Sequence, residues 1–193
     1  MRRARCARAK SPRLCAGGIR QSPSDYRRII GLKTAELFRL SCQLGSRLAG
    51  FDDGFVEAAS AFGQRLGTAY QMYDDLADFF GEEKRIGKTL GTDLSGGKVT
   101  LPTLVLLNKL PAKERDELLE EIRERRSPPL ERRRALMSTH GVFAEVAESV
   151  RVELEAGVAL LAPWAHLDPT PLLVQLLGLL QDQVNSLSGG PAA

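Results

Sequence analysis

The sequence predicts an all-α protein. From Asp25 to about residue 187, apolar side chains return every three or four residues, which is the period of a helix packed along one side. No segment alternates apolar and polar residues as a half-buried strand would. The predicted helices are long enough to form a large bundle.

Length and composition limit the class of protein. The chain has 193 residues, of which 43% are hydrophobic and 26% charged. This length fits one domain or two small ones, and the composition excludes a collagenous, low-complexity or intrinsically disordered chain. The longest apolar stretch, residues 172–180, is broken by Gln175 and is too short to cross a bilayer.

The positive charge is concentrated at one end. Residues 1–28 hold nine Lys and Arg against Asp25 alone, so the remaining chain is mildly acidic. The overall charge therefore gives no argument for a nucleic-acid partner, and none is expected. The three cysteines, Cys6, Cys15 and Cys42, are odd in number and form no CxxC pair. That pattern favours a reduced, cytoplasmic setting.

We expect residues 1–24 to be a basic, disordered tail and residues 25–193 to be the helical domain. The tail mixes Arg, Ala, Pro, Gly and Ser without an apolar period. It lacks the apolar block of a secretory signal. Its Arg-rich, acid-poor composition fits a transit peptide, a solvated extension or a mis-assigned start, and the last two are favoured.

Two long helices are expected in the first half of the domain. Ile and Leu residues recur at helical spacing over residues 29–48, and Gly50 marks the end of that helix. Asp52 and Asp53 can cap the start of the second helix. This second helix is expected to end at Gly81. Residues 81–97 contain five glycines and are predicted to form a long loop.

Four further helices are expected after this loop. The first has Pro102 in its first turn, where proline is tolerated. The second is strongly charged, with Glu and Arg spaced as on a solvated face, and it stops at Ser127-Pro128-Pro129. The last two are amphipathic. The four cover about residues 101–110, 113–126, 141–162 and 168–187.

The second long helix carries an acidic motif. Gln71, Asp74, Asp75 and Asp78 are separated by steps of three, four and seven residues, which places them on one stripe of the helix. The positions four residues before and after Asp74 are Tyr70 and Asp78, so the helix itself supplies no counter-charge. The flanking residues are apolar and aromatic, which indicates a packed helix. A solvated acidic face is the alternative interpretation.

A divalent cation would satisfy such a stripe. Mg²⁺ prefers oxygen ligands and usually binds through one or two carboxylates together with substrate phosphates. The following loop offers groups that could bind those phosphates. Gly87-Lys88-Thr89 and Gly96-Gly97-Lys98 place ammonium groups beside flexible backbone. The sequence therefore predicts a Mg²⁺-diphosphate site.

Other kinds of site fit these residues less well. A P-loop would need glycine where Glu82 stands, and it would follow a strand rather than a helix. His140 and His166 have no second metal ligand at a suitable spacing. No Gly-x-Ser-x-Gly motif or Cys/His pair indicates a nucleophilic enzyme.

Taken in order, the motifs resemble those of the trans-type polyprenyl (isoprenyl) diphosphate synthases. Lys33-Thr34 resembles the family's Lys-Thr segment. Tyr70-Gln71-x-x-Asp74-Asp75-x-x-Asp78 resembles its second aspartate-rich motif, with tyrosine where phenylalanine is usual. Residues 87–94 and 97–102 resemble the stretch that follows. The resemblance is close over about residues 25–110 and looser to about residue 187.

The resemblance implies an isoprenoid-synthase-type helical bundle around a central cavity, usually in a homodimer. It implies condensation of isopentenyl diphosphate with an allylic diphosphate, in which Mg²⁺ joins the allylic diphosphate to two aspartate-rich helices. It also implies three groups of site residues. These are Lys33, Lys88 and Lys98 for the diphosphate, Asp74 as chief metal ligand with Asp75 and Asp78 contributing directly or through water, and Thr34 and Gln71 facing the reacting carbon.

One departure affects the expected function. The family's first aspartate-rich motif and its isopentenyl diphosphate site lie upstream of the Lys-Thr segment, but only the basic tail precedes Lys33 here. We therefore expect a bundle incomplete on its N-terminal side and negligible turnover by the chain alone. Two alternatives are a non-catalytic partner subunit that pairs with a complete synthase, and a non-functional remnant that aggregates through exposed apolar faces.

Overall fold

The computed structural model describes residues 22–126 and 128–187. Within these ranges every regular element is helical and there is no strand, which confirms the all-α prediction. No helix in the described part of the chain is both long and apolar enough to span a membrane. The first 21 residues of the predicted tail, with Cys6 and Cys15, lie outside the described residues.

The first three helical elements follow one another without an intervening loop. Helix α1 (Pro23–Ile30) begins at a capping box, in which the Ser22 hydroxyl accepts from the Asp25 amide and the Asp25 carboxylate accepts from the Ser22 amide. A π-helical turn, η1 (Gly31–Ala35), connects it to α2 (Glu36–Leu48). Helix α1 therefore starts two residues before the predicted domain boundary.

The second long helix is α3 (Asp53–Phe80), capped as predicted by Asp52, whose side chain accepts from the Phe55 amide. The segment predicted as a long loop after it contains two short helices, α4 (Glu83–Ile86) and α5 (Thr92–Ser95).

Three short helices follow: α6 (Leu101–Lys109), α7 (Ala112–Arg123) and α8 (Leu130–Thr139). Helix α8 was not predicted. Its sequence follows two prolines and mixes charged and apolar residues without a clear helical stripe. The other two match the predicted helices to within three residues.

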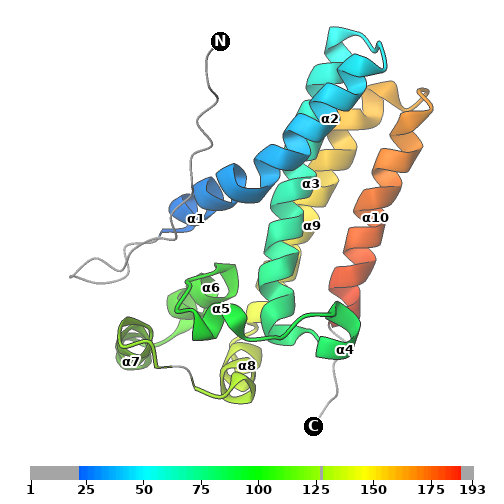
Figure 1. Ribbon diagram of the computed structural model, residues 1–193. Helices are drawn as coiled ribbons and strands as arrows, with labels where there is room; N and C mark the ends of the chain where they lie inside the picture. Colours follow the sequence, from blue (N-terminus) through cyan, green and yellow to red (C-terminus); the bar gives the residue numbers. More distant parts are fainter. Residues whose placement is uncertain (1–21, 127, 188–193) are drawn as a thin grey trace.

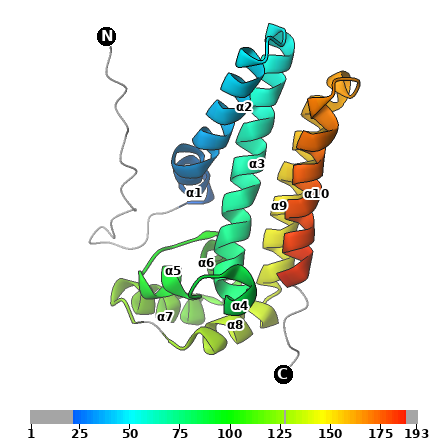
Figure 2. The same ribbon diagram turned by 45° about the vertical axis from the view of Figure 1, so that its right-hand side comes forward.

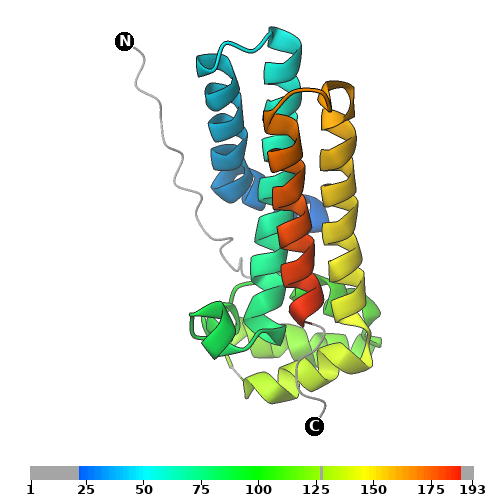
Figure 3. The same cartoon turned by 90° about the vertical axis from the view of Figure 1, so that its right-hand side faces the viewer.

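Four long helices, α2, α3, α9 (Val142–Leu161) and α10 (Pro169–Leu187), run side by side in alternating directions (Figure 3). Helix α3 packs against both α2 and α9, while α4 to α8 gather at one end of the bundle (Figures 1 and 2). The most buried large side chains include Phe62, Met72 and Leu76 of α3 and Val146 and Val150 of α9.

Two glycines let α2 and α3 approach closely. A Cβ atom added at Gly63 would lie 2.5 Å from the Phe38 carbonyl oxygen, and one at Gly67 would lie 2.6 Å from the Ala35 Cα. Neither distance is tolerated between non-bonded atoms, so only glycine permits this contact. The contact brings the π-helical turn against the C-terminal half of α3.

A buried carboxylate joins three helices. Glu153 of α9 is 3% exposed, and its two oxygens accept from Arg27 of α1 at 2.6 Å and from Arg65 of α3 at 2.8 Å. Burial acts to raise the pKa of Glu153, but the hydrogen bonds and charges of Arg65 and Arg27 outweigh it and lower the pKa below its ordinary value.

Glu153→Gln should lower the free energy of unfolding by about 1–3 kcal/mol, because both arginines lose a charged acceptor. The loss is limited to this range because both arginine side chains are about half exposed to water. Since the pKa of Glu153 is lowered in the folded state, its contribution is present above the ordinary pKa and is lost as the pH falls through the lowered value.

Urea unfolding of the native protein and the variant between pH 7 and pH 2 measures this difference. Glu148→Gln is the matched control, because Glu148 lies on the same helix and pairs with Arg151 in solvent. A Glu153→Gln effect that did not shrink in acid would contradict the assignment.

Candidate functional site

The acidic motif occupies the C-terminal half of α3, but its members have different surroundings. Asp75 and Asp78 are 3% and 0% exposed, and Gln71 is 7% exposed. Only Asp74 is partly open to solvent. The alternative of a solvated acidic face is therefore wrong for Asp75 and Asp78.

The predicted Lys-Thr segment forms the π-helical turn. The Glu36 amide donates to the Gly31 carbonyl five residues earlier, which defines this turn. The Thr34 hydroxyl donates to Gln71 Oε1 at 2.6 Å, so the two residues expected to face the reacting carbon are in direct contact. Such π turns within helices are frequent at functional sites. Nothing in the apolar spacing indicated this one.

Asp74 and Lys88 form an ion pair at the open side of α3. The Lys88 ammonium donates to Asp74 Oδ1 at 2.5 Å, and both side chains are more than a third exposed. Partial burial acts to lower the pKa of Lys88, but the hydrogen bond and charge of Asp74 raise it. Gly87, with φ of 73°, ends α4 in the left-handed conformation just before Lys88.

Asp78 holds the loop that follows α3. Its Oδ1 accepts from the Thr92 amide at 3.3 Å and from the Thr92 hydroxyl at 3.1 Å, and its Oδ2 accepts from the Asp93 amide at 3.1 Å. Its backbone carbonyl accepts from the Gly91 amide at 3.0 Å. The side chain thus secures the start of α5 from within the protein.

Asp93 pairs with Lys98, whose ammonium donates to Asp93 Oδ1 at 2.6 Å. Lys98 is exposed, as is Lys33, for which no carboxylate of the described residues lies within ion-pair distance. Asp93 was not among the expected site residues. Asp93 lies beyond α3, so the helical spacing that identified the acidic motif could not identify it.

Asp75 is held by two donors. Tyr26 of α1 donates its hydroxyl to Oδ2 at 2.7 Å, and Gln71 donates from Nε2 to Oδ1 at 2.9 Å. Burial raises the pKa of Asp75 to about 6, although both hydrogen bonds favour the carboxylate. Burial, then the charge of Asp75, raises the pKa of Tyr26 well above its ordinary value. Sequence reasoning missed Tyr26, which precedes Asp75 by 49 residues.

Within the described residues, no group of three or more Asp, Glu, His or Cys side chains is arranged to hold a metal ion. Asp74, Asp75 and Asp78 point to different partners: a lysine, a tyrosine with a glutamine, and backbone amides. The arrangement offers one accessible carboxylate, beside a lysine and beside the Thr34–Gln71 pair.

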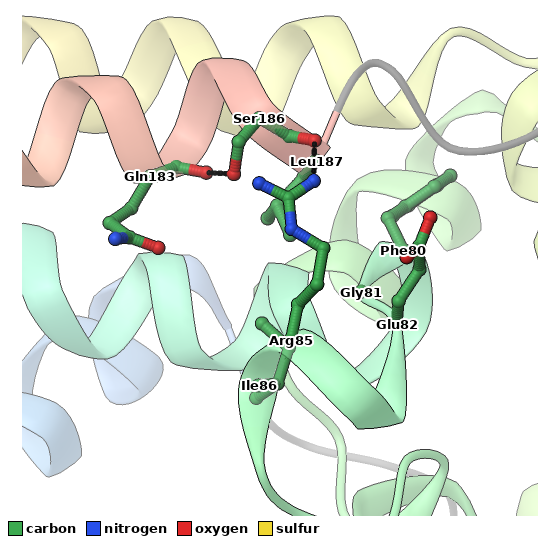
Figure 4. Close-up of a pocket in the computed structure, with 8 residues that line it drawn as sticks. All are labelled: Phe80, Gly81, Glu82, Arg85, Ile86, Gln183, Ser186 and Leu187. Carbon is green, nitrogen blue, oxygen red and sulfur yellow. Dashed lines mark hydrogen bonds between the residues drawn. The ribbon is translucent and has the colours of Figure 1, made fainter.

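A separate pocket of about 230 Å³ lies between the end of α3, α4 and the end of α10 (Figure 4). Arg85 reaches across it and donates to the Ser186 carbonyl at 3.4 Å. Glu82 and Gln183 also line it. None of the expected site residues does, so this pocket is distinct from the acidic motif.

Comparisons with known proteins agree with these features. The polyprenyl synthetase family model matches residues 15–138. The chain is 36% identical over 133 residues to heptaprenyl diphosphate synthase component 2 of Bacillus subtilis, covering 68% of this chain and 37% of that protein. It is 42% identical over 84 residues to geranylgeranyl diphosphate synthase of Mycobacterium tuberculosis, covering 44% of this chain and 24% of that one.

Solved structures show the same relationship. A polyprenyl synthase from Caulobacter crescentus, complexed with calcium and isoprenyl diphosphate, superposes with a TM-score of 0.79 and 29% identity over 84% of this chain and 50% of that one. A polyprenyl synthase from Roseobacter denitrificans gives 0.75 and 28%, covering 84% and 54%. The chain thus spans about half of these structures, and the family model covers well over half of the chain: it belongs to the polyprenyl synthetase family.

Proposed function

We propose that this chain supplies the allylic-diphosphate side of a prenyltransferase site, which condenses isopentenyl diphosphate with an allylic diphosphate. The supporting observation is that two side-chain pairs, each with one member on α3, lie next to each other. The Asp74–Lys88 ion pair lies one helical turn from the Thr34–Gln71 hydrogen bond, and Gln71 Nε2 is 3.5 Å from Asp74 Oδ2. Groups suited to a diphosphate thus stand next to groups suited to a developing cation.

The donor set of this chain fits Mg²⁺ held jointly with substrate. Asp74 is the accessible carboxylate of the motif, and Mg²⁺ commonly binds through one or two carboxylates, phosphate oxygens and water. We propose Asp74 as the direct ligand, with Asp75 and Asp78 supporting α3 and the loop behind it. When bound, the ion supplies positive charge against the leaving diphosphate.

The chain's own residues would act on the two ends of the allylic substrate. Lys88 and Lys33 would neutralise the diphosphate, and Lys98 could join them by leaving Asp93. The oxygens of Thr34 and Gln71 would lie toward the carbon that loses the diphosphate, where their dipoles favour positive charge. Cleavage of the carbon–oxygen bond would thus be favoured by stabilisation of both the leaving diphosphate and the developing cation.

A second candidate is a partner subunit that acts through a complete synthase. One relative is named as component 2 of a heptaprenyl diphosphate synthase, a name that implies a further component. In this chain α2 carries a stripe of exposed leucines, with Leu37, Leu44 and Leu48 being 68%, 55% and 88% exposed. A large exposed apolar face marks an interaction surface or an aggregation-prone one.

Incorporation of radiolabelled isopentenyl diphosphate separates the candidates. We expect negligible product from the purified chain, and product when a complementary N-terminal portion of a family member is added. A change in the products of a complete synthase on addition of the chain would favour the partner subunit. Normal elongation by the chain alone would contradict the expected need for a second polypeptide. Aggregation without activity in any mixture would favour the remnant.

Asp74→Ala should weaken Mg²⁺-dependent binding of inorganic pyrophosphate by about ten-fold or more, because one charged oxygen ligand is lost. Isothermal titration calorimetry with and without EDTA measures this. Glu120→Ala is the control, since Glu120 pairs with Arg123 on the charged surface helix α7. Equal weakening by both substitutions would argue against a metal-binding role for Asp74.

Asp78→Ala should weaken binding by a different route. It removes the acceptor of three hydrogen bonds from Thr92 and Asp93, so the loop carrying Lys88 and Lys98 keeps the bond from the Gly91 amide to the Asp78 carbonyl but loses its attachment to the Asp78 side chain. We expect faster hydrogen exchange at the Thr92 and Asp93 amides in the free protein, measured by NMR or mass spectrometry. Asp74→Ala should leave that exchange unchanged. Unaltered exchange in Asp78→Ala would show that the loop does not depend on this residue.

A further inference from the structure

Four polar side chains form one hydrogen-bonded series through α1, the π-helical turn and α3. Tyr26 donates to Asp75 at 2.7 Å, Gln71 donates to the other Asp75 oxygen at 2.9 Å, and Thr34 donates to Gln71 Oε1 at 2.6 Å. Tyr26, Asp75 and Gln71 are each less than 9% exposed, whereas Thr34 is partly open. The series runs from the core to the surface that carries Asp74.

The direction of each bond follows from the chemistry of Asp75. An ionised carboxylate can only accept hydrogen bonds, so Gln71 must present its Nε2 to Asp75. Its Oε1 then faces Thr34, whose single proton is used in that bond. Reversing the carboxamide would set two acceptor oxygens against each other in the interior, which is costly. The outer end of the series therefore presents oxygen lone pairs.

We propose that Tyr26 is a positioning residue for the prenyl-transfer site: its buried hydroxyl holds the Asp75 carboxylate, which in turn fixes the Gln71 carboxamide with its oxygen toward the allylic carbon. This inference rests on the proposed function, because only that function places a cation beside Thr34 and Gln71. It assigns Asp75 to a place behind the site, in contrast to Asp74 on the open side.

The surroundings of Tyr26 support this role. Its ring is in the core and its hydroxyl reaches a carboxylate 49 positions along the chain. The next residue, Arg27, binds the buried Glu153 of α9 at 2.6 Å, so α1 is also tied to α9 beside Tyr26. Both Asp75 oxygens are engaged by protein donors, which leaves that carboxylate committed to Tyr26 and Gln71.

Tyr26→Phe tests the proposal because it removes one oxygen and keeps the ring. Tyr73→Phe is the matched control: Tyr73 is on α3 itself, and its hydroxyl donates to a glutamine of α10, Gln183, at 3.3 Å. Asp75→Asn is the second variant, which keeps the shape of the side chain but can present a donor to Gln71. Circular dichroism and urea unfolding establish that each variant folds.

The first readout is the side-chain amide of Gln71 in ¹H–¹⁵N NMR spectra of the free chain. We expect its protons to exchange with water more slowly than those of the exposed Gln183. Tyr26→Phe should shift the Gln71 resonances and speed their exchange, and Asp75→Asn should do the same. The proposal would be overturned if the native Gln71 amide protons exchanged as fast as those of Gln183, or if Tyr26→Phe changed neither their resonances nor their exchange rate.

The second readout is the preference for positive charge at the reacting carbon. Calorimetry in Mg²⁺ compares an allylic thiolodiphosphate, neutral at that carbon, with an alkylammonium diphosphate that is charged there. Loss of one hydrogen bond from the series should lower the native preference for the charged analogue about five-fold in Tyr26→Phe. Inorganic pyrophosphate affinity should stay within about two-fold, because Asp74 and Lys88 are untouched. Tyr73→Phe should match the native protein in both measurements.

The outcomes separate the two proposals. If both analogues bind and the preference for charge is unchanged in Tyr26→Phe and Asp75→Asn, this inference fails while the proposed function stands. If neither analogue nor pyrophosphate binds the native chain, even with a complementary N-terminal portion present, the proposed function fails and the positioning role fails with it.

Discussion

The close contact between α2 and α3 is the constraint on which the candidate site depends. Gly63 and Gly67 let the backbone of one helix rest against the other, because a methyl group at either position would collide with main-chain atoms. At this separation the π-helical turn reaches α3, and the short Thr34 side chain can bond to Gln71. A wider separation of α2 and α3 would break the hydrogen bond between Thr34 and Gln71 at the edge of the core.

The acidic motif illustrates how a helical stripe divides once its neighbours are in place. Consecutive residues are about 100° apart around an α-helix, so Asp74 and Asp75 lie at opposite edges of the stripe that spacing assigns to both. Asp75 faces α1 and is buried against Tyr26, while Asp74 faces the loop and meets Lys88. Asp78 lies between them in angle and one turn further along, where it binds the start of α5. Three like side chains therefore have three different environments.

Much of this architecture follows from local signals in the sequence. Apolar spacing gave the all-α class and the long helices, and the Asp52 cap located the start of α3. The structure places Lys88 beside Asp74 and Thr34 beside Gln71, while the roles expected of these residues stay predictions. Helix α8 was missed because its sequence lacks an apolar stripe, and the π-helical turn was missed because it is only five residues long, too short for apolar spacing to distinguish it from the helices on either side.

Tyr26 could not be found in this way, because its significance comes from a contact 49 residues away and aromatic residues on helices usually serve only as core. Its place is secured by a second long-range contact, the ion pair of Arg27 with the buried Glu153, to which Arg65 of α3 also binds. That cluster ties α1 to α3 and α9 through the residue next to Tyr26. The polar side chains behind the site are thus held by the packed half of the bundle, so their orientation does not require a ligand. Asp74 and Lys88, at the open end, are paired with each other in partly exposed positions, and in the proposed function this ion pair would be exchanged for contacts with an incoming anion and its cation.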